Sequence, residues 1–140
     1  MTLFLLHASK PSQKESMKLF FRLLRAILGP FMLLKERLSR PQGIVRVPQD
    51  QAKVDAACQK LALYQFTTCP FCIKVRQEMR RLSLNVEFRD AQNSAQHRQT
   101  LLTQGGSAKV PCLRITDDKG NVRWLYESAD IIRYLRQQFA

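Results

Sequence analysis

The chain has 140 residues, 45% of them hydrophobic, and this length suits one domain with a modest core. Its net charge of +12 favours anionic partners, but no basic run with interleaved aromatic residues is present, so we expect no nucleic-acid binding. Four cysteines are too few for the disulfide framework of a small secreted protein. We therefore expect reduced thiols in a cytosol-like compartment.

A strongly apolar stretch runs from Leu19 to Leu34 in the more densely charged N-terminal part. Arg22 and Arg25 lie inside this stretch, and Gly29-Pro30 is expected to break it. At about 1.5 Å per residue it is too short to cross a hydrocarbon core of roughly 30 Å. It is more typical of a helix that lies on a membrane surface.

The chain is therefore expected to divide into three parts. Residues 1–40 form a helical extension and possible membrane anchor, residues 41–58 a linker, and residues 59–140 the main domain. Within the extension, residues 17–40 would contact an anionic membrane surface. The alternative is a helix that packs on the domain or on a second copy. The expected location is cytoplasmic, with attachment to the cytoplasmic face of a membrane as the more specific hypothesis.

Residues after 60 show the regular patterns of an α/β domain, β-α-β-α-β-β-α. Strands joined through a helix are expected to be parallel and the last pair, joined by a tight turn, antiparallel. These elements predict a mixed four-stranded sheet covered by helices, with Ser128 as the N-cap of the last helix. The expected strands are 61–66, 85–90, 109–116 and 122–126, and the expected helices are 70–83, 94–104 and 128–139.

Cys69 and Cys72 form a Cys-x-x-Cys pattern where the first strand meets the first helix. Pro70 suits the first helical turn, so Cys69 lies at the helix N-terminus, whose free N–H groups stabilise a thiolate. Lys74 and Arg76 add positive potential nearby. Cys72 lies one turn further along, beneath Cys69. Cys69 is therefore expected to attack a disulfide and Cys72 to resolve the product.

Two other interpretations of this cysteine pair remain open. A structural zinc site usually needs two such pairs, whereas Cys58 and Cys112 are single and the histidines are His7 and His97. The pair could also be two inert core residues. The redox interpretation is favoured over both, and no metal is expected.

Three motifs, CPFC (69–72), KVPCL (109–113) and YESADIIRYL (126–135), together resemble the glutaredoxins, which have the thioredoxin fold. They also resemble the related N-terminal domain of glutathione transferases, over roughly Leu61 to Gln138. The resemblance implies a glutathione-dependent thiol–disulfide oxidoreductase with Cys69 as nucleophile and Cys72 as resolving thiol. Glutathione would be the co-substrate, and disulfide-bonded or glutathionylated proteins the partners.

The resemblance also implies a glutathione site. The backbone of Val110 would pair with the cysteinyl unit, next to a cis bond to Pro111. The helix that starts at Ser128 also offers N–H groups to a carboxylate. Plainer alternatives are an N-cap for Ser128, core packing for Phe71, an exposed carboxylate for Glu127 and an edge-strand role for Pro111. The resemblance assigns six residues to glutathione: Phe71, Val110, Pro111, Glu127, Ser128 and Asp130.

Some positions depart from the glutaredoxin pattern. Phe66 replaces a common lysine, so a contact to the glycine carboxylate of glutathione is either missing or supplied by another cation, such as Arg98 or Lys109. Cys112 is either a third redox-active thiol or a small strand residue. The all-helical domain of transferases is not expected after Ala140, which favours an oxidoreductase. Two alternatives to this function remain, a membrane-associated adaptor with little turnover and an iron–sulfur cluster carrier.

Overall fold

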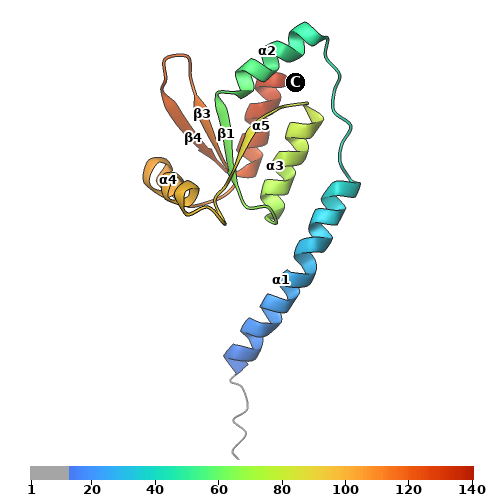
Figure 1. The fold of residues 1–140 in the computed structure, drawn as a ribbon, viewed down its shortest axis with the longest axis vertical. Helices are drawn as coiled ribbons and strands as arrows, with labels where there is room; N and C mark the ends of the chain where they lie inside the picture. Colours follow the sequence, from blue (N-terminus) through green and yellow to red (C-terminus); the bar gives the residue numbers. More distant parts are fainter. Residues whose placement is uncertain (1–12) are drawn as a thin grey trace, which may run out of the picture.

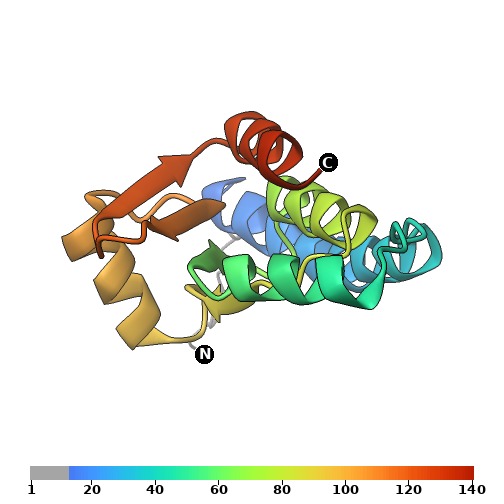
Figure 2. The ribbon, with the colours of Figure 1, turned by 90° about the horizontal axis from the view of Figure 1, so that it is seen from above.

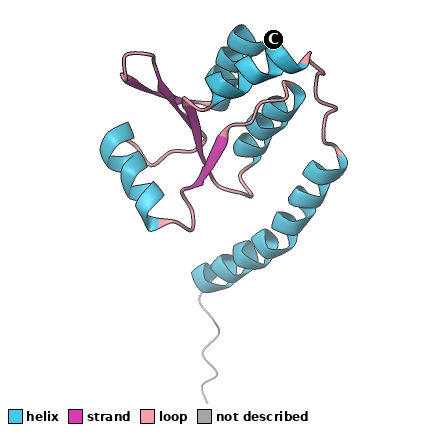
Figure 3. Cartoon of the chain, turned by 45° about the horizontal axis from the view of Figure 1, so that its top comes forward, coloured by secondary structure: helices cyan, strands magenta, loops and turns pink. Residues whose placement is uncertain are grey.

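The structure is a computed structural model that describes residues 13–140. It contains a sheet with helices on both faces and a long N-terminal helix that projects from this domain (Figures 1 and 3). The first 12 residues of the expected extension lie outside the described residues. The elements are α1 (Gln13–Leu38), α2 (Pro48–Cys58), β1 (Leu61–Gln65), α3 (Pro70–Arg81), β2 (Glu87–Asp90), α4 (Ala95–Gly105), β3 (Cys112–Thr116), β4 (Val122–Tyr126) and α5 (Ser128–Phe139).

The four strands form one mixed sheet in the order β2-β1-β3-β4. Leu63 of β1 lies opposite Phe88 in the parallel pair with β2, and opposite Leu113 in the antiparallel pair with β3. Strands β3 and β4 are also antiparallel, with Leu113 opposite Leu125. The predicted α/β fold with a mixed four-stranded sheet is confirmed.

The expected direction of β3 is wrong. The rule that a helix joins parallel strands holds for β1-α3-β2, but β3 runs antiparallel to β1 and therefore to β2. The rule applies to a connection that carries the chain back along the sheet to the end at which the first strand began. Here α4 does not carry the chain back: β3 begins at the same end of the sheet at which β2 finishes.

Two hydrophobic clusters cover the two faces of the sheet. Leu63 belongs to the cluster beneath α3 and α5, which includes Met79 and Leu135. The next residue, Tyr64, belongs to the cluster beneath α4, which includes Leu101. Figure 2 shows α3 and α5 on one side of the sheet and α4 on the other. Because both faces are covered, β1 is buried along its whole length, as strands of this kind are.

The N-terminal part differs from the expectation in two elements. Helix α1 continues through Pro30, although proline removes a helical hydrogen bond, so the expected break is absent from the described part of this helix. The expected linker contains the helix α2, and Pro48 in its first turn is the start signal that we overlooked. The division into parts at residues 40 and 58 stays a prediction. Within residues 13–140, no helix is both long and apolar enough to cross a membrane.

Candidate functional site

The cysteine pair lies at the start of α3. Cys69 is the N-cap residue, Pro70 is the first helical residue, and the N–H of Ile73 donates to the Cys69 carbonyl at 2.9 Å. Cys69 is half-buried and Cys72 is fully buried, and both are free thiols. The arrangement agrees with the expected one, in which one sulfur lies at the helix end and the other lies beneath it.

The environment of Cys72 suppresses its ionisation. Burial, together with charge repulsion and a hydrogen bond from the neighbouring Cys69, raises the pKa of the Cys72 thiol to about 12. A backbone hydrogen bond from Phe66 opposes this shift without cancelling it. The Cys72 thiol therefore stays protonated at neutral pH while the two sulfurs remain close enough to interact.

A groove of about 400 Å³ opens beside this helix start. It collects side chains from segments that are far apart in the sequence: the loop after β1, the first turn of α3, the loop before β3, and the junction of β4 with α5. The residues that line it are Phe66, Phe71, Ala108, Lys109, Val110, Pro111, Tyr126, Glu127 and Ser128.

Five of the six residues predicted to hold glutathione meet in this groove. The Val110–Pro111 peptide bond is cis. Phe71 is 56% exposed, so its alternative role in core packing is wrong. Of the eight predicted site residues, Cys69, Cys72 and Asp130 are not among the residues that line the groove, and the Asp130 carboxylate pairs with Arg133 at 3.3 Å.

Helix α5 points its N-terminus at the groove. Its first helical bond runs from the N–H of Ile131 to the carbonyl of Glu127, at 3.0 Å. Glu127, with a φ of 69°, is thus the N-cap, and the prediction that Ser128 is the N-cap is wrong by one residue. The N–H groups of the first turn have no partner within a helix, so this end of α5 can accept a carboxylate.

Lys109 is the better placed of the two cations considered for a second carboxylate. It lines the groove, whereas Arg98 donates to the carbonyls of Ala91, at 3.1 Å, and Gln92. Lys74 lies 5.8 Å from the centre of the Phe71 ring and adds positive charge at the groove edge.

Tyr126 belongs to the groove but was missed in the sequence. Its hydroxyl contacts the carbonyls of Gly105 at 3.0 Å and Ser107 at 2.8 Å, which ties the end of α4 to the groove wall. Burial, followed by repulsion from Cys112, raises the pKa of Tyr126 to about 12. The available signal was an aromatic residue directly before the Glu127-Ser128 pair.

Cys112 lies on the opposite face of the sheet from α3. It pairs with Tyr64 across β1 and β3 and packs in the cluster beneath α4. Burial raises the pKa of its thiol to about 11. Since the sheet separates Cys112 from Cys72, this geometry favours the interpretation of Cys112 as a small strand residue.

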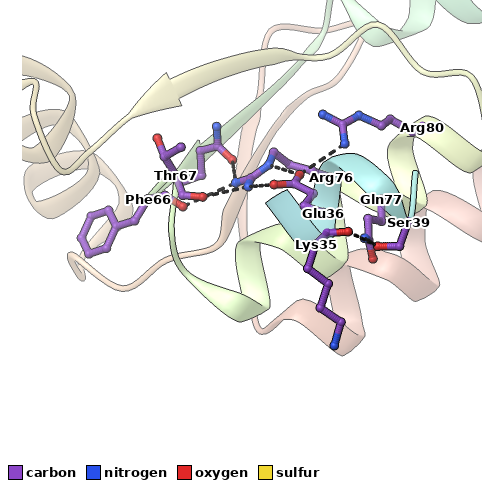
Figure 4. A network of polar contacts seen from close by, with 9 residues as sticks. Lys35, Glu36, Ser39, Phe66, Thr67, Arg76, Gln77 and Arg80 are labelled. Carbon is purple, nitrogen blue, oxygen red and sulfur yellow. Dashed lines mark hydrogen bonds and ion pairs between the residues drawn. The ribbon is translucent and has the colours of Figure 1, made fainter. Parts of the chain in front are cut away.

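Arg76 adds positive potential near the cysteine pair, as predicted, because its charge acts to lower the pKa of Cys72 against the larger effect of burial. It does so from a buried position, in which it pairs with Glu36 of α1 at 2.8 Å (Figure 4). The sequence contains a hint, because Arg76 lies among the buried α3 residues Cys72, Val75 and Met79. An arginine on the buried face of a helix needs a buried partner. Among residues 13–140, no group of three or more metal-ligating side chains comes together.

The fold is that of a thioredoxin-like domain of the kind that begins glutathione transferases. The profile of the family "Glutathione S-transferase, N-terminal domain" matches residues 63–140, and the chain therefore belongs to this family. No curated protein matched the sequence.

Solved structures of two kinds resemble the chain. One is maleylacetoacetate isomerase from Anaeromyxobacter dehalogenans 2CP-1 with bound dicarboxyethyl glutathione and citrate, at 25% identity and a TM-score of 0.45. The other is glutathione transferase Omega 2C from Trametes versicolor, at 22% identity and a TM-score of 0.47. Each match covers 57% of this chain, but only 37% of the isomerase and 38% of the transferase.

Proposed function

We propose that the protein is a glutaredoxin-like oxidoreductase that reduces protein disulfides or glutathione mixed disulfides through Cys69 and Cys72. The observation that carries the proposal is the pairing of a half-buried thiol at the N-terminus of α3 with a buried thiol one turn below. A helix N-terminus stabilises a thiolate, and the thiolate is the nucleophile in disulfide exchange. The family match supports a role for glutathione as co-substrate.

The proposed reaction begins when the Cys69 thiolate attacks a disulfide sulfur, so that a new bond to the Cys69 sulfur forms and the substrate thiolate leaves. An incoming glutathione thiolate can then attack the mixed disulfide between Cys69 and glutathione, which frees Cys69 and forms glutathione disulfide. Alternatively, the Cys72 thiolate attacks the mixed disulfide, which releases the second substrate thiolate and forms a Cys69–Cys72 disulfide. Two glutathione molecules then reduce that disulfide in two further displacements, so in both routes the two electrons come from glutathione, which ends as glutathione disulfide.

The environment of Cys72 supports its role in the second step. Repulsion from Cys69 contributes to its raised pKa. Once Cys69 is bound in a mixed disulfide, it no longer carries a charge, so this repulsion disappears and Cys72 ionises more easily. Cys72 is thus held protonated before the first step and released for the second.

The groove supports the predicted glutathione contacts. The N-terminus of α5, with Glu127 and Ser128, would hold the γ-glutamyl end, and the Val110 backbone would pair with the cysteinyl unit. Lys109 is the proposed partner of the glycine carboxylate. Asp130 remains a weaker candidate, because it lies outside the groove lining.

The test is the glutathione-coupled reduction of a small mixed disulfide by wild type and by Cys69→Ser and Cys72→Ser. We expect Cys69→Ser to lose turnover and Cys72→Ser to retain the part that incoming glutathione can resolve. Full activity of Cys69→Ser would refute the proposal. A wild-type protein without turnover would favour the adaptor, and a coloured protein after anaerobic iron–sulfur reconstitution would favour cluster carriage.

We also propose that α1 binds an anionic membrane surface with the face that points away from the domain. Eleven large apolar side chains of α1 are exposed, among them Phe20, Ile27 and Phe31. These three lie on the side of the helix opposite Glu36, which faces α3. The basic residues that accompany them are Lys14, Lys18, Arg22, Arg25, Lys35, Arg37 and Arg40.

Vesicle sedimentation tests this membrane contact. The full chain should bind phosphatidylglycerol-containing vesicles more tightly than phosphatidylcholine vesicles, because basic residues near the surface attract anionic lipid. Replacing Phe20, Ile27 and Phe31 together by Asp should abolish binding. Equal binding by this variant, or a stable dimer in ultracentrifugation that the same substitutions dissociate, would contradict membrane contact.

A further inference from the structure

Arg76 joins the N-terminal helix to the loop between β1 and α3 (Figure 4). Its side chain donates from Nε to Glu36 Oε1 at 3.0 Å and from Nη2 to Glu36 Oε2 at 2.8 Å, a two-pronged ion pair. The other contacts reach Gln65 Oε1 at 2.7 Å, the Thr67 carbonyl at 2.8 Å and the Phe66 carbonyl at 3.5 Å. All five N–H donors of the guanidinium are thereby used.

Among residues 13–140, Glu36 is the only partner of Arg76 in these contacts that comes from α1. It is 6% exposed and Arg76 is 4% exposed, so both charges are shielded from water. Burial alone would raise the pKa of Glu36, but the hydrogen bond and charge of Arg76, with help from Arg80, lower it. Glu36 is therefore ionised, and its removal would leave a buried guanidinium without its counter-ion.

The loop held by Arg76 contacts both cysteines. The Cys69 N–H donates to the Phe66 carbonyl at 3.3 Å, which is one of the carbonyls that Arg76 also contacts. The Phe66 backbone also lies near enough to the Cys72 thiol to act on its pKa, which it lowers against the larger effect of burial. A shift of the Phe66 carbonyl would thus move the cap of α3 and the surroundings of both sulfurs.

Helix α1 also lies near the same loop at Gly29. A methyl group placed on Gly29 would lie 3.7 Å from the side chain of Thr68, the residue before Cys69. Elsewhere the two helices pack loosely, because a groove of about 260 Å³ lies between Met32 of α1 and Ile73 of α3. The position of α1 therefore depends on the buried ion pair more than on apolar packing.

We propose that Glu36 is a positioning residue of the redox site, and that the docked position of α1 controls the reactivity of the cysteine pair. Through Arg76, Glu36 fixes the loop that presents Cys69. This inference rests on the proposed function for its consequence in turnover. A force on α1, such as its attachment to a membrane surface, would reach the cysteines through this ion pair.

The test compares Glu36→Gln with the matched control Glu78→Gln in the full chain. Glu78 is also a buried carboxylate with two arginine partners, Arg81 and Arg136, but these lie away from the cysteine loop. Two quantities are measured on folded protein: kcat in the glutathione-coupled assay and the rate of Cys69 alkylation by iodoacetamide. Urea unfolding measures the stability that each variant loses.

We expect Glu36→Gln to lower kcat about tenfold and to change the Cys69 alkylation rate by a similar factor, because small displacements of reacting groups are costly. Glu78→Gln should leave both rates nearly unchanged. Rates of the two variants within threefold of each other would overturn the proposal, and a larger difference supports it. If Glu36→Gln does not fold, Glu36→Asp and Glu78→Asp replace the pair under the same criterion.

The alkylation rate separates this proposal from the proposed function. If Cys69→Ser kept full turnover, the oxidoreductase mechanism would fail, while the effect of Glu36 on Cys69 alkylation would still be measurable. If turnover depended on Cys69 but neither rate depended on Glu36, only the positioning role would fail.

Discussion

Alkylation of the reduced, folded protein should be confined to Cys69. Burial raises the pKa of Cys72 from the ordinary 9.0 to about 12, which lowers its thiolate fraction near neutral pH about a thousandfold. Burial raises the pKa of Cys112 to about 11, a reduction of about a hundredfold, and it raises the pKa of Cys58 as well. These three thiols are also almost fully shielded from solvent, whereas Cys69 is half-buried.

The assay is a time course with iodoacetamide at mildly alkaline pH, followed by intact mass and peptide mapping. Wild type should take up one adduct, at Cys69, and Cys69→Ser should stay unmodified over the same period. In denaturing urea all four cysteines of wild type should react, which controls for the reagent. If Cys72 reacted within tenfold of the rate of Cys69, the reasoning from burial and pKa would be refuted.

Two further predictions concern groups outside the cysteine pair. The hydrogen bond from Arg81 lowers the pKa of Glu78 to about 2, so the stability it contributes is complete above about pH 4.5 and is lost as the pH falls through about 2. Glu78→Gln should therefore lower the free energy of unfolding, measured in urea, by about 1–2 kcal/mol at pH 7 and by much less near pH 2; the figure for pH 7 allows for solvent screening of the partly exposed arginines. A loss that stays the same at both pH values would contradict this. Gly105→Ala should cost about 1–3 kcal/mol and raise the KM for glutathione, because the added methyl would lie 2.7 Å from the Tyr126 hydroxyl. Gly106→Ala is its control, because at a φ of 87° the added methyl strains the backbone but meets no atom within 4 Å, Tyr126 included; an equal KM in the two variants would argue against a role for Tyr126 in the groove.

The sequence by itself determined the local elements and the cysteine motif. Alternation, helical spacing and a proline after Cys69 act between residues only a few positions apart, and they predicted most strands and helices of the domain. The same local signals placed Cys69 at a helix start and Cys72 one turn beneath it. Even these local signals placed a helix start only to within about one residue, because the N-cap of α5 is Glu127 and not the predicted Ser128.

Only the tertiary structure decided which distant groups meet. The direction of β3 depends on the end of the sheet from which α4 returns the chain, and the register of β3 against β1 places Cys112 opposite Tyr64, beneath α4. The ion pair of Glu36 with Arg76 joins residues 40 positions apart, which no local pattern encodes. Local patterns reflect backbone propensity and periodicity, whereas these contacts depend on how the assembled elements bury charge and apolar surface together.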